Sequence, residues 1–193
     1  HSRAILAQLG QAGRLMAIDQ DPEAVKFAQQ TIQDERFEIV HGSFEHVQKF
    51  CDQRGWCGKV NGLLLDLGVS SPQLDDATRG FSFMREGPLD MRMNPEAGLS
   101  AKEWLKQVDE KTLKLVLQNY GEERFSGRLA RTIKEASQVD ALQTTADLAA
   151  LVKQNSPKTE KNKHPATRTF QAIRIAVNRE LDVLKTVLEA TMQ

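Results

Sequence analysis

The chain has few cysteines, few aromatic side chains and no excess of charge of either sign. Of its 193 residues two are cysteine, too few for a disulfide scaffold. Cys51 and Cys57 have no Cys or His pair at metal-ligand spacing beside them, so we expect reduced thiols and no metal site. The 26 basic and 26 acidic side chains cancel. Net charge therefore gives no reason to expect nucleic acid, although a balanced total can conceal a local basic face.

The sequence also lacks a long apolar run, and we expect no secretory signal. No apolar segment approaches the roughly 20 residues that span a bilayer. The hydrophobic fraction of 40% is typical of a globular protein, and the length suits one domain or one domain carrying an insertion. We expect a cytoplasmic protein with no membrane contact.

Three short apolar runs in the first third of the chain predict β-strands, at residues 15–18, 37–40 and 60–65. Helical patterns separate them, one after Pro22 and one at residues 44–50. Alternation of strand and helix predicts an α/β fold with a parallel sheet. The third run is followed at once by turn residues, which favours a fully buried strand.

The helix after the first strand has clear local signals. Asp21 is a suitable N-cap and Pro22 suits the first helical position. The expected apolar stripe contains Ala24, Val25, Phe27, Ala28 and Ile32.

The second part of the chain is predicted to be helical. Helical periodicity covers residues 101–108, 110–120, 124–136 and 145–154. We therefore expect a partial α/β core at residues 1–73, a helical insertion at 74–164 and a helix returning to the core at 165–193. The string "NSPKTEKNKHPAT" predicts an exposed basic connector.

One long helix is expected from Thr167 to the end, with its apolar face packed on the sheet. That face would contain Phe170, Ile173, Val177, Leu181, Leu184 and Leu188.

Two predicted strands end in residues that suit a nucleotide site. Asp19 ends the first strand, where an acid can accept hydrogen bonds from both ribose hydroxyls. Phe44 follows the second strand in "HGSF", where it could stack on an adenine. The structural alternatives are that Asp19 and Asp21 cap the next helix and that Phe44 turns into the core.

The stretch "VNGLLLDLGVSSPQLDD" ends its apolar run in Asp66 and a polar turn. A site that acts on a planar amine needs hydrogen-bond acceptors held by such a turn. The alternative is that Ser70, Ser71 and Pro72 only begin a helix.

Basic residues gather later in the chain. Arg124, Arg128 and Arg131 share one face of a predicted helix. A second basic group contains Lys158, Lys161, Lys163, His164, Arg168 and Arg174. These positions are suited to a phosphate backbone, or else they are solvated or paired with acids such as Glu122 and Glu123.

Several long strings together resemble one family. They are "HSRAIL", "AIDQDPEA", "HGSF", "LLLDLGVSSPQLDDATRGFSFMREGPLDMRM", "YGEERFSGRLARTI" and "KHPATRTFQAIRIAVNRELD". In order and over nearly the whole chain, they resemble the MraW (RsmH) family of bacterial 16S ribosomal RNA (cytosine-N4)-methyltransferases.

The resemblance implies a class I, Rossmann-like methyltransferase with a helical insertion that recognises RNA. It implies S-adenosylmethionine as methyl donor and N4 of a cytosine in the decoding region of 16S rRNA as acceptor. The cofactor residues that it implies are His1, Asp19, Phe44, Asp66 and Gln73. We expect catalytic contributions from Asp66, Ser70, Ser71 and Pro72, although Gln73 stands where other amino-methyltransferases carry an aromatic residue.

The RNA-binding residues that we expect are Arg124, Arg128, Arg131, Lys163, His164, Arg168 and Arg174. The resemblance implies the small ribosomal subunit as partner and allows a homodimer. It also places a strand and most of a glycine-rich loop before His1, and further strands after Gln193, so weak cofactor binding is expected of these residues alone. The alternatives are a non-enzymatic RNA-binding module and an NAD-linked oxidoreductase, which would share Asp19.

Overall fold

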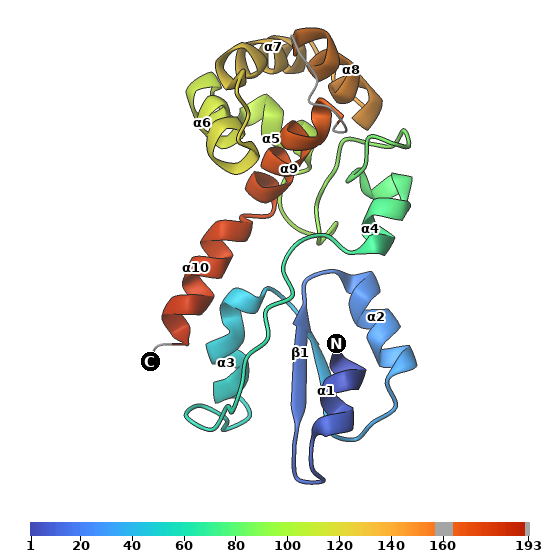
Figure 1. Ribbon diagram of the computed structural model, residues 1–193, viewed down its shortest axis with the longest axis vertical. Coiled ribbons are helices and arrows are strands. Elements are labelled where there is room, and N and C mark those ends of the chain that lie inside the picture. The colour runs from blue at the N-terminus through green and yellow to red at the C-terminus, as the bar shows by residue number, and fades with distance from the viewer. Residues whose placement is uncertain (157–163, 192–193) are drawn as a thin grey trace. The chain divides into compact units, whose positions relative to one another are not determined.

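The computed structural model describes residues 1–156 and 164–191, which divide into two compact units (Figure 1). The first unit is His1–Asp66 with the segment from Leu181 onward. The second is Leu67–Glu180. No helix in the described part of the chain is long and apolar enough to cross a membrane.

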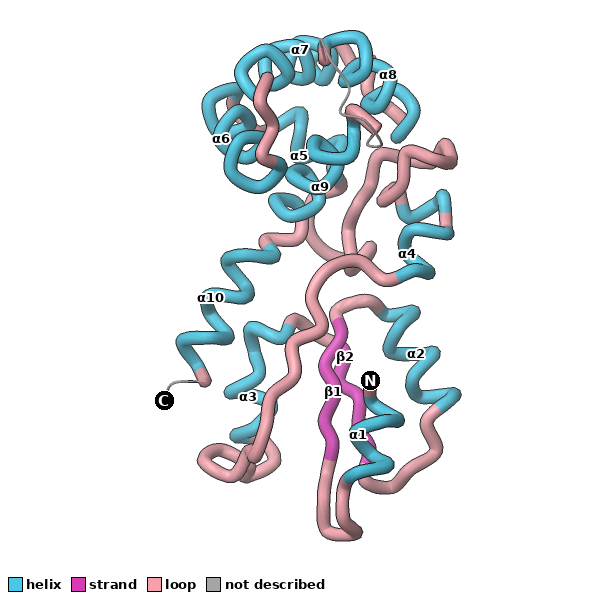
Figure 2. Tube along the Cα trace, viewed as in Figure 1, coloured by secondary structure: helices cyan, strands magenta, loops and turns pink. Residues whose placement is uncertain are grey.

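A two-stranded parallel sheet lies in the first unit (Figure 2). Strand β1 (Leu15–Asp19) pairs with β2 (Phe37–His41), so that Asp19 lies opposite His41. Helix α2 (Pro22–Thr31) connects the two strands. The α/β character and these two predicted strands are confirmed.

Helix α2 begins as its sequence indicates. The Asp21 carboxylate accepts a hydrogen bond from the backbone N–H of Glu23, 3.0 Å away, and Pro22 is the first helical residue. Val25 is buried, as expected of the apolar stripe. Phe27 was wrongly assigned to that stripe, because its side chain is 67% exposed.

Helix α1 (Ser2–Gln8) is held by an arginine that directly precedes β2. The Arg36 guanidinium donates to the carbonyl oxygens of Leu6 at 3.1 Å and Leu9 at 2.8 Å, which lie at the end of α1. Asp34 fixes the same guanidinium with contacts of 3.0 and 2.7 Å. Cationic groups at a helix C-terminus are stabilising because the terminal carbonyls carry partial negative charge.

The first unit is completed by short helices. Strand β2 is followed by the 3₁₀ helix η1 (Phe44–His46) and by α3 (Val47–Asp52), which confirms the predicted helix at 44–50. Helix α10 (Glu180–Ala190) contributes the buried residues Val183 and Val187.

Residues 60–65 do not form the third strand that we predicted. Within the described residues this segment has no strand assignment, and Val60, Leu63 and Leu64 are 52%, 48% and 60% exposed. An apolar run becomes a strand when a neighbour supplies partners for its N–H and C=O groups. Here β1 and β2 pair with each other and neither pairs with residues 60–65.

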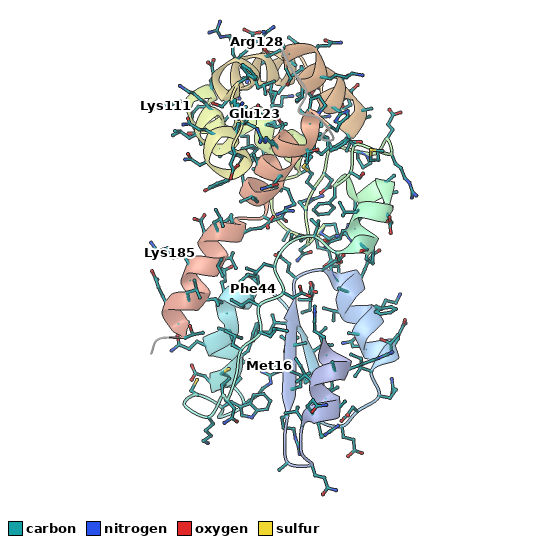
Figure 3. All side chains as sticks on the ribbon, viewed as in Figure 1. Met16, Phe44, Lys111, Glu123, Arg128 and Lys185 are labelled. Carbon is teal, nitrogen blue, oxygen red and sulfur yellow. The ribbon has the colours of Figure 1, made fainter. Side chains whose placement is uncertain are left out.

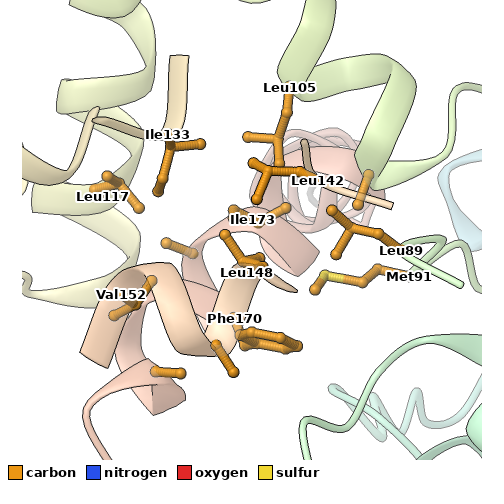
Figure 4. Packing of buried hydrophobic residues seen from close by; sticks show 14 of the residues in the cluster. Leu89, Met91, Leu105, Leu117, Ile133, Leu142, Leu148, Val152, Phe170 and Ile173 are labelled. Atoms are coloured by element: carbon orange, nitrogen blue, oxygen red, sulfur yellow. The ribbon is translucent and has the colours of Figure 1, made fainter. Parts of the chain in front are cut away.

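The second unit is helical. Its helices are α4 (Ser71–Asp75), η2 (Ala77–Arg79), α5 (Ala101–Gln107), α6 (Glu110–Gly121), α7 (Ser126–Gln138), α8 (Thr145–Asn155) and α9 (Ala166–Val177). The four predicted helices between residues 101 and 154 are confirmed within two residues at each end. The core that they share, shown in Figure 4, includes Leu89, Leu105, Leu117, Ile133, Leu148 and Ile173.

Close packing of α6 on α9 depends on a glycine. A Cβ atom built on Gly121 would lie 2.5 Å from the backbone oxygen of Arg168. No side chain fits at that distance, so glycine permits the approach.

The long helix predicted from Thr167 is in fact two helices. It breaks at Asn178 and Arg179, where Arg179 has a left-handed φ of 51°. The Asn178 amide donates to the backbone oxygen of Met91 at 2.8 Å and accepts from the N–H of Met93 at 2.7 Å. The helix ends where the Asn178 side chain forms these hydrogen bonds to a distant segment of the chain.

The face of α9 was also assigned wrongly. Its buried residues Phe170 and Ile173 belong to the core of the helical unit, with α6 as the main neighbour, and not to the face of a sheet. The compact units divide between Asp66 and Leu67 and between Glu180 and Leu181, and α9 shares a core with the preceding helices. Most of the predicted basic connector lies outside the described residues.

Candidate functional site

The carboxyl ends of β1 and β2 bring Asp19 close to the "HGSF" turn. The backbone N–H of Gly42 donates to the Asp19 carbonyl at 2.9 Å, which continues the ladder past the last strand residues. Parallel strands present their carboxyl ends at one edge of the sheet, where ligands of open α/β sheets bind. Asp19 and Phe44 thus flank the same edge, as predicted.

The Asp19 carboxyl is half-buried, and burial raises its pKa above the ordinary value. The backbone N–H groups of Asp21 and Gln20 oppose this shift, and Asp19 Oδ1 accepts from the Asp21 N–H at 2.9 Å. Asp21, rather than Asp19, is the N-cap of α2. The structural alternative, in which both acids cap the next helix, therefore explains Asp21 fully and Asp19 only in part.

The turn after β2 places Phe44 at the start of η1. Phe44, labelled in Figure 3, is half-buried, and the Ser43 hydroxyl caps the same turn by accepting from the Glu45 N–H at 3.4 Å. A Cβ atom on Gly42 would lie 3.1 Å from Phe50 Cζ. Gly42 therefore has a packing role beside Phe50, in addition to any role toward a ligand.

The first unit also joins His1 and Asp66, which are 65 positions apart in the sequence. His1 Nδ1 lies 3.0 Å from Asp66 Oδ2, and the two side chains are 67% and 74% exposed. An exposed pair of this kind contributes little stability. Its polar atoms are accessible to a ligand.

The polar turn after Asp66 begins helix α4 in the second unit. Ser70 and Gln73 form a capping box: the Gln73 N–H donates to Ser70 Oγ at 3.3 Å, and Gln73 Oε1 accepts from the Ser70 N–H at 3.0 Å. Ser70, Ser71 and Pro72 therefore begin a helix, which was the structural alternative for this turn. Gln73 is 5% exposed and its carbonyl oxygen is occupied, which the cofactor prediction did not anticipate.

Four of the five predicted cofactor residues lie in the first unit, in two places: Asp19 with Phe44 at the sheet edge, and His1 with Asp66. Gln73 and the Ser70 to Pro72 turn belong to the second unit. Across residues 1–156 and 164–191, no group of three His, Cys, Asp or Glu side chains is arranged to hold a metal ion.

The predicted RNA-binding residues have different surroundings. Arg124, Arg128 and Arg131 are exposed, whereas Arg174 is half-buried and forms a bidentate pair with Glu180 at 2.7 and 3.0 Å. The His164 ring stacks on Phe83 at 4.5 Å between centroids.

Of the other two predicted residues, Arg168 is half-buried on α9. Lys163 lies outside the described residues.

Two exposed lysines of α6 were missed in the sequence. Lys111 and Lys114 are three positions apart on the helix. Arg128 and Arg131 have the same spacing. Lysines are so common on exposed helices that this spacing alone does not indicate a binding surface.

Comparison with known proteins gives two findings. The family model described as the MraW methylase family matches residues 1–193. The chain is also 72% identical over 192 residues to "Ribosomal RNA small subunit methyltransferase H" of Hydrogenovibrio crunogenus. That match covers 100% of this chain and 61% of the relative, so the chain spans about three fifths of the relative's length. On the sequence strings, the sheet edge and these two matches, the chain belongs to the MraW methylase family.

Proposed function

We propose that the protein methylates N4 of a cytosine in 16S ribosomal RNA with S-adenosylmethionine as methyl donor. The observation that carries the proposal is the sheet edge where Asp19 and the Gly42 to Phe44 turn meet, in a chain of this family. We place a class I, Rossmann-like core in the first unit and RNA recognition in the second. The reaction would occur in the cytoplasm on the small ribosomal subunit, and the predicted homodimer remains a prediction.

The side chains at the sheet edge fit an adenosine group. An acid at the end of β1 can accept from both ribose hydroxyls, and the half-buried Phe44, in the turn after β2, is the candidate aromatic for adenine. The raised pKa of Asp19 reflects a partly desolvated carboxylate, which binds a hydroxyl donor more strongly than one in water does. When bound, S-adenosylmethionine supplies an electrophilic methyl group.

The remaining site residues would make the acceptor amine of cytosine a better nucleophile. The lone pair of a cytosine N4 is conjugated with the ring, so oxygen acceptors that bind its protons favour attack. Asp66 is a suitable acceptor because its side chain is exposed, although its Oδ2 atom is engaged by His1 Nδ1 at 3.0 Å. In the Ser70 to Pro72 turn, the capping box fixes the backbone and leaves the exposed Ser71 hydroxyl and backbone oxygens as candidates.

Orientation is expected to provide most of the rate enhancement. Well-oriented reacting groups gain roughly 7–11 kcal/mol relative to a bimolecular encounter. The protein would hold the base and the methyl donor in line, without a covalent intermediate. A base taken out of its stack suits this geometry.

The proposal is tested by calorimetric titration with S-adenosylmethionine. We would compare the chain, a form extended at both ends to the relative's length, and Asp19→Asn in both. Loss of charge-assisted hydrogen bonds, each worth about 1.5–3 kcal/mol, predicts at least tenfold weaker binding for Asp19→Asn. Glu35→Gln, which removes an exposed acid of the same unit, is the matched control.

Thermal melting shows whether weaker cofactor binding by Asp19→Asn is caused by unfolding of the protein. Because the fold raises the Asp19 pKa, the ionised form is disfavoured in the folded state, and its contribution to stability declines as pH rises through the folded pKa. Asp19→Asn should therefore not lower the melting temperature at neutral pH. A folded extended form that fails to bind S-adenosylmethionine would contradict the proposal.

The two alternatives predict different ligands. An NAD-linked oxidoreductase would bind NAD in the same titration with Asp19 dependence. A non-enzymatic RNA-binding module would bind RNA and neither cofactor. Family membership favours neither alternative.

A further inference from the structure

Helices α6 and α7 and the turn between them carry exposed cations that form no ion pair with an acid in the described part of the chain. Arg36, Arg54, Arg92 and Arg174 each form a two-pronged pair with Asp or Glu. In contrast, five exposed cations of the α6 and α7 region make no ion pair within the described residues: Lys111, Lys114, Arg124, Arg128 and Arg131. Nearby Glu122 is exposed too, and forms no ion pair with them in this part of the chain.

A phenylalanine is exposed among these cations. Phe125 is 38% exposed, between Arg124 and Arg128 in the sequence, and it is the N-cap residue of α7. The Lys114 side chain approaches the same turn, since a Cβ atom on Gly127 would lie 3.7 Å from Lys114 Cε. Figure 3 labels Lys111, Glu123 and Arg128 in this unit.

The backbone beneath the Phe125 ring is anchored. Its N–H faces Glu123 Oε1 at 3.4 Å, and its carbonyl accepts from the Leu129 N–H at 3.0 Å. Glu123 is 7% exposed, and its own N–H donates to Leu117 of α6 at 3.0 Å. The backbone of Phe125 is therefore held by both helices, while the residue is 38% exposed.

We propose that Phe125 is a stacking platform for an unpaired base of the RNA substrate, with Lys111, Lys114, Arg124, Arg128 and Arg131 along the adjoining phosphates. The inference rests on the proposed function and names which part of the RNA the helical unit holds. An anchored aromatic ring among unpaired cations is the combination that binds single-stranded nucleic acid. Paired RNA keeps its bases stacked internally and offers such a ring no free face.

The first test measures binding of the chain to a fluorescein-labelled 12-nucleotide single-stranded RNA and to its duplex. Base stacking on an aromatic ring is worth about 1–3 kcal/mol, so Phe125→Ala should weaken single-strand binding about 5- to 150-fold. Duplex binding should change little. Phe27→Ala is the matched control, because Phe27 is 67% exposed in the first unit and has no place in this surface.

The second test separates stacking from packing and from charge. Phe125→Tyr should retain binding, whereas Phe125→Leu should lose it at an unchanged melting temperature. Arg128→Gln should lower the salt dependence of binding by about one unit of log–log slope, and Phe125→Ala should leave that slope unchanged. A 2-aminopurine base in the RNA should show quenching that Phe125→Ala abolishes.

Each outcome decides a separate question. Equal affinity of the wild type, Phe125→Ala and Phe125→Leu for single strands would overturn the inference, and so would absence of RNA binding by the wild type. If RNA binding depends on Phe125 while the extended form does not bind S-adenosylmethionine, the proposed methyltransferase function fails and the stacking site stands.

Discussion

Several leucines of the helical unit are completely buried, whereas two leucines of residues 60–65 in the first unit are about half exposed. Leu113, Leu117 and Leu129 are fully buried; Leu63 and Leu64 are 48% and 60% exposed. The helices satisfy their own backbone hydrogen bonds and need neighbours only for their apolar faces. Strands need neighbours for both, and neither β1 nor β2 pairs with residues 60–65.

The largest effect should come from truncating a core leucine of the helical unit. Leu117→Ala is expected to lower the free energy of unfolding by about 2–5 kcal/mol, because it leaves a cavity among α6, α7 and α9. Leu64→Ala should change it by less than about 0.5 kcal/mol. Urea denaturation followed by circular dichroism measures both, and equal losses would remove the contrast between the units.

A smaller effect is expected from adding one methyl group where α6 meets α9. Gly121→Ala should cost about 1–3 kcal/mol, because its Cβ would lie 2.5 Å from the Arg168 carbonyl oxygen. Gly62→Ala is the control, since a Cβ there meets no atom within 4 Å. The same denaturation assay applies, and a neutral Gly121→Ala would mean that the two helices can move apart freely.

The smallest expected effect is a loss of stability at low pH, and it is confined to the first unit. Arg36 lowers the pKa of Asp34 from 3.8 to about 2. A depressed carboxyl pKa gives stability that is present above pH 3.8 and is lost as pH falls toward 2. Asp34→Asn should remove this part of the acid sensitivity.

The two tryptophans allow the units to be followed separately. Trp56 lies in the first unit and Trp104 in the second. In a Trp104→Phe background, fluorescence melts at pH 4 and pH 2 should differ less for Asp34→Asn than for its parent. In a Trp56→Phe background, Asp34→Asn should have no effect, and a change there would contradict the assignment to one unit.

Local signals predicted the helices well. Asp21 and Pro22 gave the start of α2, and the S-x-x-Q spacing of Ser70 and Gln73 is the pattern of the capping box that begins α4. These features depend on residues three or four positions apart, which the sequence displays directly. The place of Asp19 at the carboxyl end of β1 was predictable too, because it directly follows a short apolar run.

Features that depend on distant residues were not predictable. The apolar spacing continues through Asn178, yet the helix breaks there because Asn178 bonds to Met91 and Met93. Residues 60–65 have strand composition, but composition does not supply a pairing partner. Phe27 fits an apolar stripe by spacing, and its exposure shows that spacing does not fix which turn of a helix is covered.

The helical unit is one uninterrupted stretch, Leu67–Glu180, with a core of its own. A gene segment of this kind can be exchanged, duplicated or lost by recombination at two joints without disturbing the packing inside it. Exchange of this one stretch would therefore move the helices together with their core and leave the β1–β2 pairing of the first unit intact.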